Sequence, residues 1–109
     1  MNGTRLRLDA QHFTPDPGAL EAQAQVLKAM AHPVRLCILQ GLLGEGERNV
    51  GELQCSLGAP QSTVSQHLGK LRSAGLLCAR RQGTEVYYRL ATPLVRRVLR
   101  ALAEPARPA

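Results

Sequence analysis

Residues 60–77 hold the side chains from which the chemistry of this chain is most directly inferred. Val64, Leu68 and Leu71 recur at helical spacing, so they share one buried face of a helix. The opposite face has short hydrogen-bonding groups at its start and a cation one turn later: Gln61, Ser62, Ser65, Gln66 and Lys70. Such a face suits the DNA major groove, where base edges offer donors and acceptors and phosphates flank them. The pattern predicts a DNA-recognition helix.

Two kinds of DNA contact are predicted around this helix. The candidate residues are Gln61, Ser62, Thr63, Ser65, Gln66, His67, Lys70, Arg72, Arg80, Arg81 and Thr84. The Gln and Ser side chains are the candidates for base edges, because Gln pairs bidentately with adenine and Ser suits several edges. Thr63 and His67 either touch phosphate or pack at the helix edge. The cations are candidates for phosphates, and an arginine beside a turn can enter a narrow minor groove.

The charge of the chain is basic and unevenly distributed. The 109 residues have a formal net charge of +6, which favours an anionic partner. Residues 59–100 hold eight of the Lys and Arg residues and one acid, Glu85. A solvated basic face is the alternative, but these cations flank a helix already patterned for base contact. Arg96, Arg97 and Arg100 lie farther along, where the edge of a dimer is the favoured position.

Turn and cap residues divide the chain into one domain of several short elements. Residues 1–18 are expected to form a loose arm that ends in the turn-forming run 14–18, and a first helix is expected over 19–30. His32 and Pro33 begin a second helix, with His32 in a structural role at its N-cap, and Gly44 to Gly46 end it. Asn49 is expected to cap a third helix over 50–57, with a turn at 58–60 before the recognition helix.

The pattern changes to strands after Gly75. Residues 76–81 and 85–90 are strand-like, with a hairpin turn at 82–84 between them. Thr92 and Pro93 then begin a last helix with an apolar stripe, and 105–109 form a tail. The predicted fold is mainly α with a β-hairpin wing, a winged helix-turn-helix over residues 19–104.

The chain has three cysteines, Cys37, Cys55 and Cys78. Their odd number and wide spacing predict reduced thiols rather than a disulfide framework, and the absence of a signal peptide or apolar span predicts a cytoplasmic protein without a membrane partner. Packing as small hydrophobes is the favoured role of each cysteine. The alternative is a thiol switch or soft-metal ligand, since Arg35 and Arg80 lie near two of them in sequence and a nearby cation activates a thiol.

Residues 19–103 resemble the ArsR/SmtB family of bacterial winged-helix repressors. Five blocks in order support the resemblance: LKAMAHPVRL (27–36), VGEL (50–53), STVSQHL (62–68), LRSAGLL (71–77) and RQGTEVYYRL (81–90). The resemblance implies a homodimer whose first and last helices pair, and a repressor that leaves its operator inverted repeat when an inducer binds. The dimer candidates are Leu20, Leu27, Leu94, Val98 and Leu102.

The sensing sites of the family do not carry over. Where many metal-sensing members have Cys-Val-Cys or Cys-Val-Gly, this chain has Asn49-Val50-Gly51. Other members bind zinc through Asp, His and Glu of the last helix, which here offers only Glu104, and zinc needs about four donors placed together. Sulfur- and redox-sensing members use one cysteine in the second helix and one in the last, and only Cys37 matches. We therefore expect no metal and no cofactor.

Several functions stay open at this level. If the protein is a repressor, three possibilities for its inducer stay open. The repressor has no inducer, it responds to a thiol oxidant or sulfur species, or it binds an arsenite-like soft metal through Cys37, Cys55 and Cys78. A winged helix that binds proteins is a second class, although it would not need the cations near the recognition helix. An enzyme with a cysteine nucleophile is disfavoured, because no His or carboxylate is placed as its base in a recognised pattern.

Overall fold

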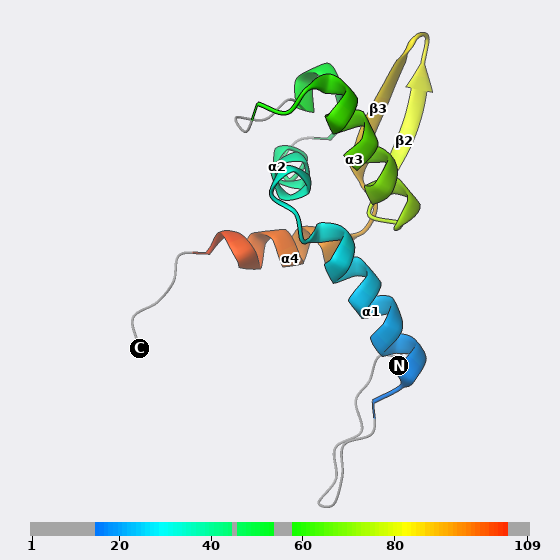
Figure 1. Cartoon of the computed structure of the whole chain (residues 1–109), viewed down its shortest axis with the longest axis vertical. Helices are drawn as coiled ribbons and strands as arrows, with labels where there is room; N and C mark the ends of the chain where they lie inside the picture. Colours follow the sequence, from blue (N-terminus) through cyan, green and yellow to red (C-terminus); the bar gives the residue numbers. More distant parts are fainter. Residues whose placement is uncertain (1–14, 45, 54–57, 105–109) are drawn as a thin grey trace, which may run out of the picture.

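The computed structural model describes residues 15–44, 46–53 and 58–104, and the fold is the predicted one (Figure 1). Its elements are α1 (Pro17–Met30), α2 (Pro33–Gly41), β1 (Arg48–Asn49), the 3₁₀ helix η1 (Gly51–Leu53), α3 (Gln61–Ser73), β2 (Leu77–Gln82), β3 (Glu85–Leu90) and α4 (Pro93–Ala103). The three strands form one antiparallel sheet in the order β1-β3-β2. The β2–β3 hairpin protrudes past α3, while α1 and α4 lie away from its tip.

Proline and a side-chain acceptor start three of the four α-helices. Asp16 accepts a hydrogen bond from the Gly18 N–H, so α1 begins at Pro17, two residues before the predicted start. Proline suits this position because its missing N–H has no helical partner there. His32 Nδ1 accepts from the Val34 N–H at 3.0 Å, which confirms its structural role, and Thr92 caps α4 as predicted.

The second helix is shorter than predicted. It ends at Gly41 rather than near Gly44, and two arginine side chains bind carbonyls at this end. Arg48 Nε donates to the Gly41 carbonyl at 2.9 Å, and the Arg96 guanidinium donates to the Leu43 carbonyl. Helix ends leave carbonyls without helical partners, so these contacts hold the end of α2 against β1 and α4.

The segment before the recognition helix differs most from its prediction. Asn49 is the expected cap, since its Oδ1 accepts from the Glu52 N–H and Glu52 Oε1 accepts from the Asn49 N–H, both at 2.9 Å. This reciprocal pair is a capping box. The cap leads into the 3₁₀ turn Gly51–Leu53, and the remainder of the predicted helix, residues 54–57, lies outside the described residues. Arg48 and Asn49 also pair with Tyr88 and Tyr87 as a short strand, which was not predicted.

Two glycines with left-handed backbone shape the wing. Gly75, at φ +80°, comes after α3, where the Gly75 and Leu76 N–H groups donate to the Arg72 and Leu71 carbonyls. This Schellman arrangement ends the recognition helix and turns the chain into β2. Gly83, at φ +64°, occupies the hairpin turn, and the paired register runs from Leu77↔Leu90 to Gln82↔Glu85. The strands lie within one residue of the predicted ranges.

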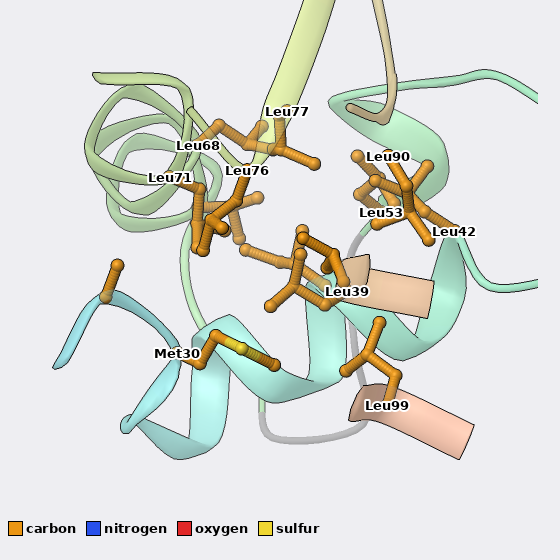
Figure 2. Close-up of a cluster of buried hydrophobic side chains, with 14 residues drawn as sticks. Met30, Leu39, Leu42, Leu53, Leu68, Leu71, Leu76, Leu77, Leu90 and Leu99 are labelled. Carbon is orange, nitrogen blue, oxygen red and sulfur yellow. The ribbon is translucent and has the colours of Figure 1, made fainter. Parts of the chain in front are cut away.

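One apolar core joins the helices, η1, β2 and β3 (Figure 2). Val64, Leu68 and Leu71 are fully buried, which confirms the predicted inner face of α3. Around them pack the buried residues Met30, Ile38, Leu39, Leu42, Leu53, Leu76, Leu77, Leu90, Val95 and Leu99. Burying one such side chain contributes about 1.5–3 kcal/mol. No polar or charged side chain of the described residues is buried, so the core beneath α3 is entirely apolar.

Candidate nucleic-acid interface

The outer face of α3 presents most of the predicted DNA contacts to solvent. Gln61, Ser62, Ser65, Gln66, Lys70 and Arg72 are exposed, and Thr63 and His67 are half-buried at its edge. Because Val64, Leu68 and Leu71 hold the inner face, the outward direction of the polar residues is set by helical periodicity. The structure thus presents uncharged hydrogen-bonding groups at the start of the helix and cations in its later turns.

The wing adds two arginines beside α3, and their surroundings differ. Arg80 binds Glu47 through Nε and Nη2, with an Nη2–Oε1 distance of 2.7 Å, and Nη1 donates to Gln82 Oε1 at 2.8 Å. The hydrogen bond from Arg80 lowers the pKa of the Glu47 carboxyl, and the same bond raises the pKa of Arg80. Arg81 is exposed and has no such partner among the described residues, and Thr84 is exposed beside the turn. Of the two guanidinium groups, only that of Arg80 is therefore already paired with a carboxylate of the described residues.

His67 is held from the inner side of the interface. Its Nδ1 accepts a hydrogen bond from Arg35 Nε at 3.1 Å, and its ring centroid lies 4.4 Å from that of His32. Burial lowers the pKa of the His67 imidazole most, and the electrostatic effects of its neighbours His32, Arg35 and Lys70 lower it further. Neither Arg35 nor Glu47 was a predicted interface residue. Their contacts join residues more than 30 positions apart, which no local pattern signals.

An apolar groove separates α1 from α4. Its volume is about 340 Å³, and it is lined by Ala19, Ala22, Gln23, Val26, Leu27, Leu94 and Val98. Four of the five predicted dimer residues are exposed leucines: Leu20 (42%), Leu27 (60%), Leu94 (48%) and Leu102 (59%). Val98 is half-buried at the groove. Of the four leucines, Leu27 and Leu94 line the groove, and large exposed apolar side chains at a groove are typical of an interaction site.

The cysteines are spread over different elements. Cys37 lies on α2 and Cys78 on β2, both half-buried, and Cys55 lies outside the described residues. The Arg35 and Arg80 side chains bind His67 and Glu47, respectively. Across 15–44, 46–53 and 58–104, no three His, Cys, Asp or Glu residues form a group that could hold a metal ion, and no helix has the length and apolarity of a membrane span.

Comparison with known proteins identifies the family. The sequence profile described as "Bacterial regulatory protein, arsR family" matches residues 32–78, which run from the N-cap of α2 to the start of the wing. The transcriptional repressor PagR of Bacillus anthracis is 44% identical over 84 residues, which are 77% of this chain and 84% of PagR. This chain belongs to the arsR family of bacterial regulatory proteins. A biofilm growth-associated repressor of Agrobacterium fabrum is 46% identical over 72% of this chain and 67% of its own length.

Solved structures of arsR-type proteins share the fold. The crystal structure of PagR superposes with a TM-score of 0.71 at 42% identity, and the match covers 80% of this chain and 99% of PagR. A possible ArsR-family regulator of Mycobacterium bovis, described as a homodimeric winged helix-turn-helix DNA-binding domain, gives a TM-score of 0.69 at 40% identity over 78% of each chain. The predicted winged helix-turn-helix is confirmed.

Proposed function

We propose that this arsR-family protein is a transcriptional repressor that binds an operator inverted repeat as a homodimer. The observation that carries the proposal is the exposed polar face of α3 beside a wing whose Arg81 projects without a protein partner among the described residues. The relatives named above are repressors, and one structural neighbour is a homodimeric DNA-binding domain. We propose a cytoplasmic regulator rather than an enzyme.

Each part of the interface has a distinct role in the proposal. Gln61, Ser62, Ser65 and Gln66 read base edges in the major groove, because amide and hydroxyl groups match the donors and acceptors found there. Lys70, Arg72 and Arg81 neutralise phosphates and hold the helix in register. Thr84 stands at the wing tip, beside the minor groove. Arg80 stays with Glu47 and contributes less to phosphate binding.

The groove between α1 and α4 supports the dimer. A second copy of the chain would cover its exposed leucines, including Leu27 and Leu94, with the same residues of the partner, as two-fold symmetry requires. Two recognition helices related by that axis would read the two halves of an inverted repeat. The same symmetry explains why one 109-residue chain leaves so much apolar surface exposed.

Fluorescence anisotropy with the DNA upstream of this gene tests the function. At fixed salt, we expect tight binding to that DNA and binding about a thousandfold weaker to a scrambled duplex of equal length. A double change of Gln61 and Gln66 to Ala should remove the difference between the two DNAs and leave the salt-dependent binding in place. Equal affinity of the unaltered protein for both DNAs would contradict the proposal.

The same assay addresses the inducer. The reduced protein is compared with protein treated with an oxidant, a persulfide donor or arsenite, and each treatment is repeated after single substitution of Cys37, Cys55 and Cys78 by Ser. If thiol modification abolishes DNA binding and one of the substitutions prevents this loss, the protein is a thiol-sensing repressor. If arsenite abolishes DNA binding only when all three cysteines are present, it is a soft-metal sensor. Unchanged binding in every arm would assign the cysteines to packing.

A further inference from the structure

Three helices meet at the side chain of Arg35. Arg35 lies on α2, where its Nε donates to His67 Nδ1 on the recognition helix at 3.1 Å. Its Nη1 donates to the carbonyl of Ala29, near the end of α1, also at 3.1 Å. One guanidinium thus ties α1, which lines the groove, to α3, which carries the DNA-contacting face. The fork of an arginine makes this possible, because its donors point in several fixed directions.

The bond to His67 exists in only one protonation state. A guanidinium has donors and no acceptor, so His67 Nδ1 must be free of a proton to accept from it. An imidazolium is a donor at both nitrogens, and a second proton would turn the bond into a contact between two cations. The neighbouring His32 must likewise be unprotonated at Nδ1, because that nitrogen accepts a hydrogen bond from the Val34 N–H.

None of the charged groups that affect the pKa of His67 is an acid that would stabilise its protonated form. From α2 it faces Arg35, from the turn before α2 it faces the His32 ring at 4.4 Å, and one turn along α3 it has Lys70. No carboxylate of the described residues is among the groups that shift its titration, and burial together with these neighbours lowers the pKa of His67 below the ordinary 6.5. The bonded state is therefore fully favoured above about pH 6.5 and loses its advantage as the pH falls below that value.

We infer that the Arg35–His67 bond orients the recognition helix, and that protonation of His67 breaks it and releases DNA on mild acidification. His67 is then a positioning residue rather than a phosphate ligand. This inference rests on the proposed DNA-binding function. The apolar core beneath α3 does not titrate, so the helix stays folded while its orientation changes. The opposite role predicts the opposite sign, because a protonated histidine against a phosphate would bind DNA more tightly in acid.

The test measures anisotropy with the upstream DNA at constant ionic strength. We expect the unaltered protein to bind roughly threefold to tenfold more weakly at about pH 5.5 than at about pH 7.5, because an imidazole with the ordinary pKa of about 6.5, as in the broken state, is about tenfold more protonated than neutral at pH 5.5. His67→Gln keeps an oxygen acceptor for Arg35 and does not titrate, so whatever its DNA affinity at the higher pH, that affinity should be the same at both pH values. His12→Gln, which replaces the third histidine of the sequence, should retain the loss in acid.

Arg35→Lys provides the second test. A lysine donates from a single nitrogen and does not reach both acceptors, so this variant should bind DNA more weakly at both pH values while circular dichroism shows unchanged helix. Tighter binding in acid, a parallel loss in the His67→Gln variant, or full affinity of Arg35→Lys would each overturn the inference. If the unaltered protein binds the DNA at neutral pH but shows no pH dependence, only this inference fails. No specific binding at either pH would reject the proposed function as well.

Discussion

Arg80 and Arg81 are adjacent on β2, yet their charges are used differently. The Arg80 guanidinium binds the Glu47 carboxylate through two nitrogens and lies 5.2 Å from the centroid of the Tyr87 ring. Alternation along the strand directs Arg81 to the other face, where it is exposed. A cation that is already paired releases fewer counterions when it nears DNA, so Arg81 should account for more of the electrostatic binding.

The salt dependence of DNA binding separates the two residues. Arg81→Ala should reduce the slope of log K against log salt by about one, as expected for a lost phosphate contact. Arg80→Ala should reduce it clearly less, since Glu47 already neutralises that charge in the free protein. Titrations of both variants at several salt concentrations give the slopes, and equal losses would show that Arg80 leaves Glu47 to bind phosphate.

For single residues, the sequence predicted which side chains of the recognition helix are exposed better than it predicted their hydrogen-bond partners. The outward position of Gln61, Ser65 and Lys70 agrees with helical periodicity, as the structure shows. The choice of partner for Arg35 and Arg80 was not predictable, because His67 and Glu47 lie 32 and 33 positions away in the sequence.

At the scale of elements, two glycines of the recognition helix differ in their backbone conformation. Gly75, after the end of α3, has a conformation that favours glycine, whereas Gly69, inside α3, does not. Gly75 ends α3 at φ +80°, a conformation that L-residues adopt at a cost of roughly 1–2 kcal/mol. Gly69 lies within α3 on the exposed face, and a Cβ there would meet no atom within 4 Å. A helix-interior glycine costs about 0.5–1 kcal/mol relative to alanine.

The same substitution should therefore have opposite effects at these two positions. Gly75→Ala should lower the free energy of unfolding by roughly 1–2 kcal/mol, and Gly69→Ala should raise it by about 0.5–1 kcal/mol. Urea denaturation followed by circular dichroism, at one protein concentration for all variants, measures both. A destabilising Gly69→Ala would mean that the outer face of α3 is packed against something in the folded protein.

Most helices and strands were predicted from strong local sequence patterns. The structure differs from the prediction where the local pattern was weak or where contacts between distant residues decide the structure. Proline and cap residues placed the starts of α2 and α4, and β-rich runs placed the wing. The strand β1 has two residues, too few to show an alternating pattern, and it forms because β3 offers a free edge. The early end of α2 depends on Arg48 and Arg96, which reach its carbonyls from other elements.

The molecule has two candidate interaction surfaces at different ends, the outer face of α3 with the wing and the groove between α1 and α4 (Figure 1). The groove could not be predicted as a surface from the sequence, because it needs α1 and α4 to lie side by side although more than 60 residues separate them. Three of its lining residues, Leu27, Leu94 and Val98, are among the dimer candidates that the family resemblance implied, whereas Ala19 and Ala22 were not predicted. If the groove is the dimer contact, it controls how two recognition helices are held on one DNA.

A charge in the groove tests this link between the two ends. Leu27 is 60% exposed in the single chain and lines the groove, so Leu27→Glu should bury an unpaired carboxylate in each half of a dimer. Together with the lost apolar contact, this should weaken dimerisation at least about a hundredfold. Gln25→Glu places the same charge on the same helix outside the groove and serves as the control.

Analytical ultracentrifugation should show a monomer for the Leu27→Glu variant and a dimer for the Gln25→Glu variant. Binding to the full inverted repeat should fall only in the Leu27→Glu variant, while its weak binding to a single half-site persists because α3 and the wing are intact. A Leu27→Glu variant that remains dimeric would place the dimer contact elsewhere.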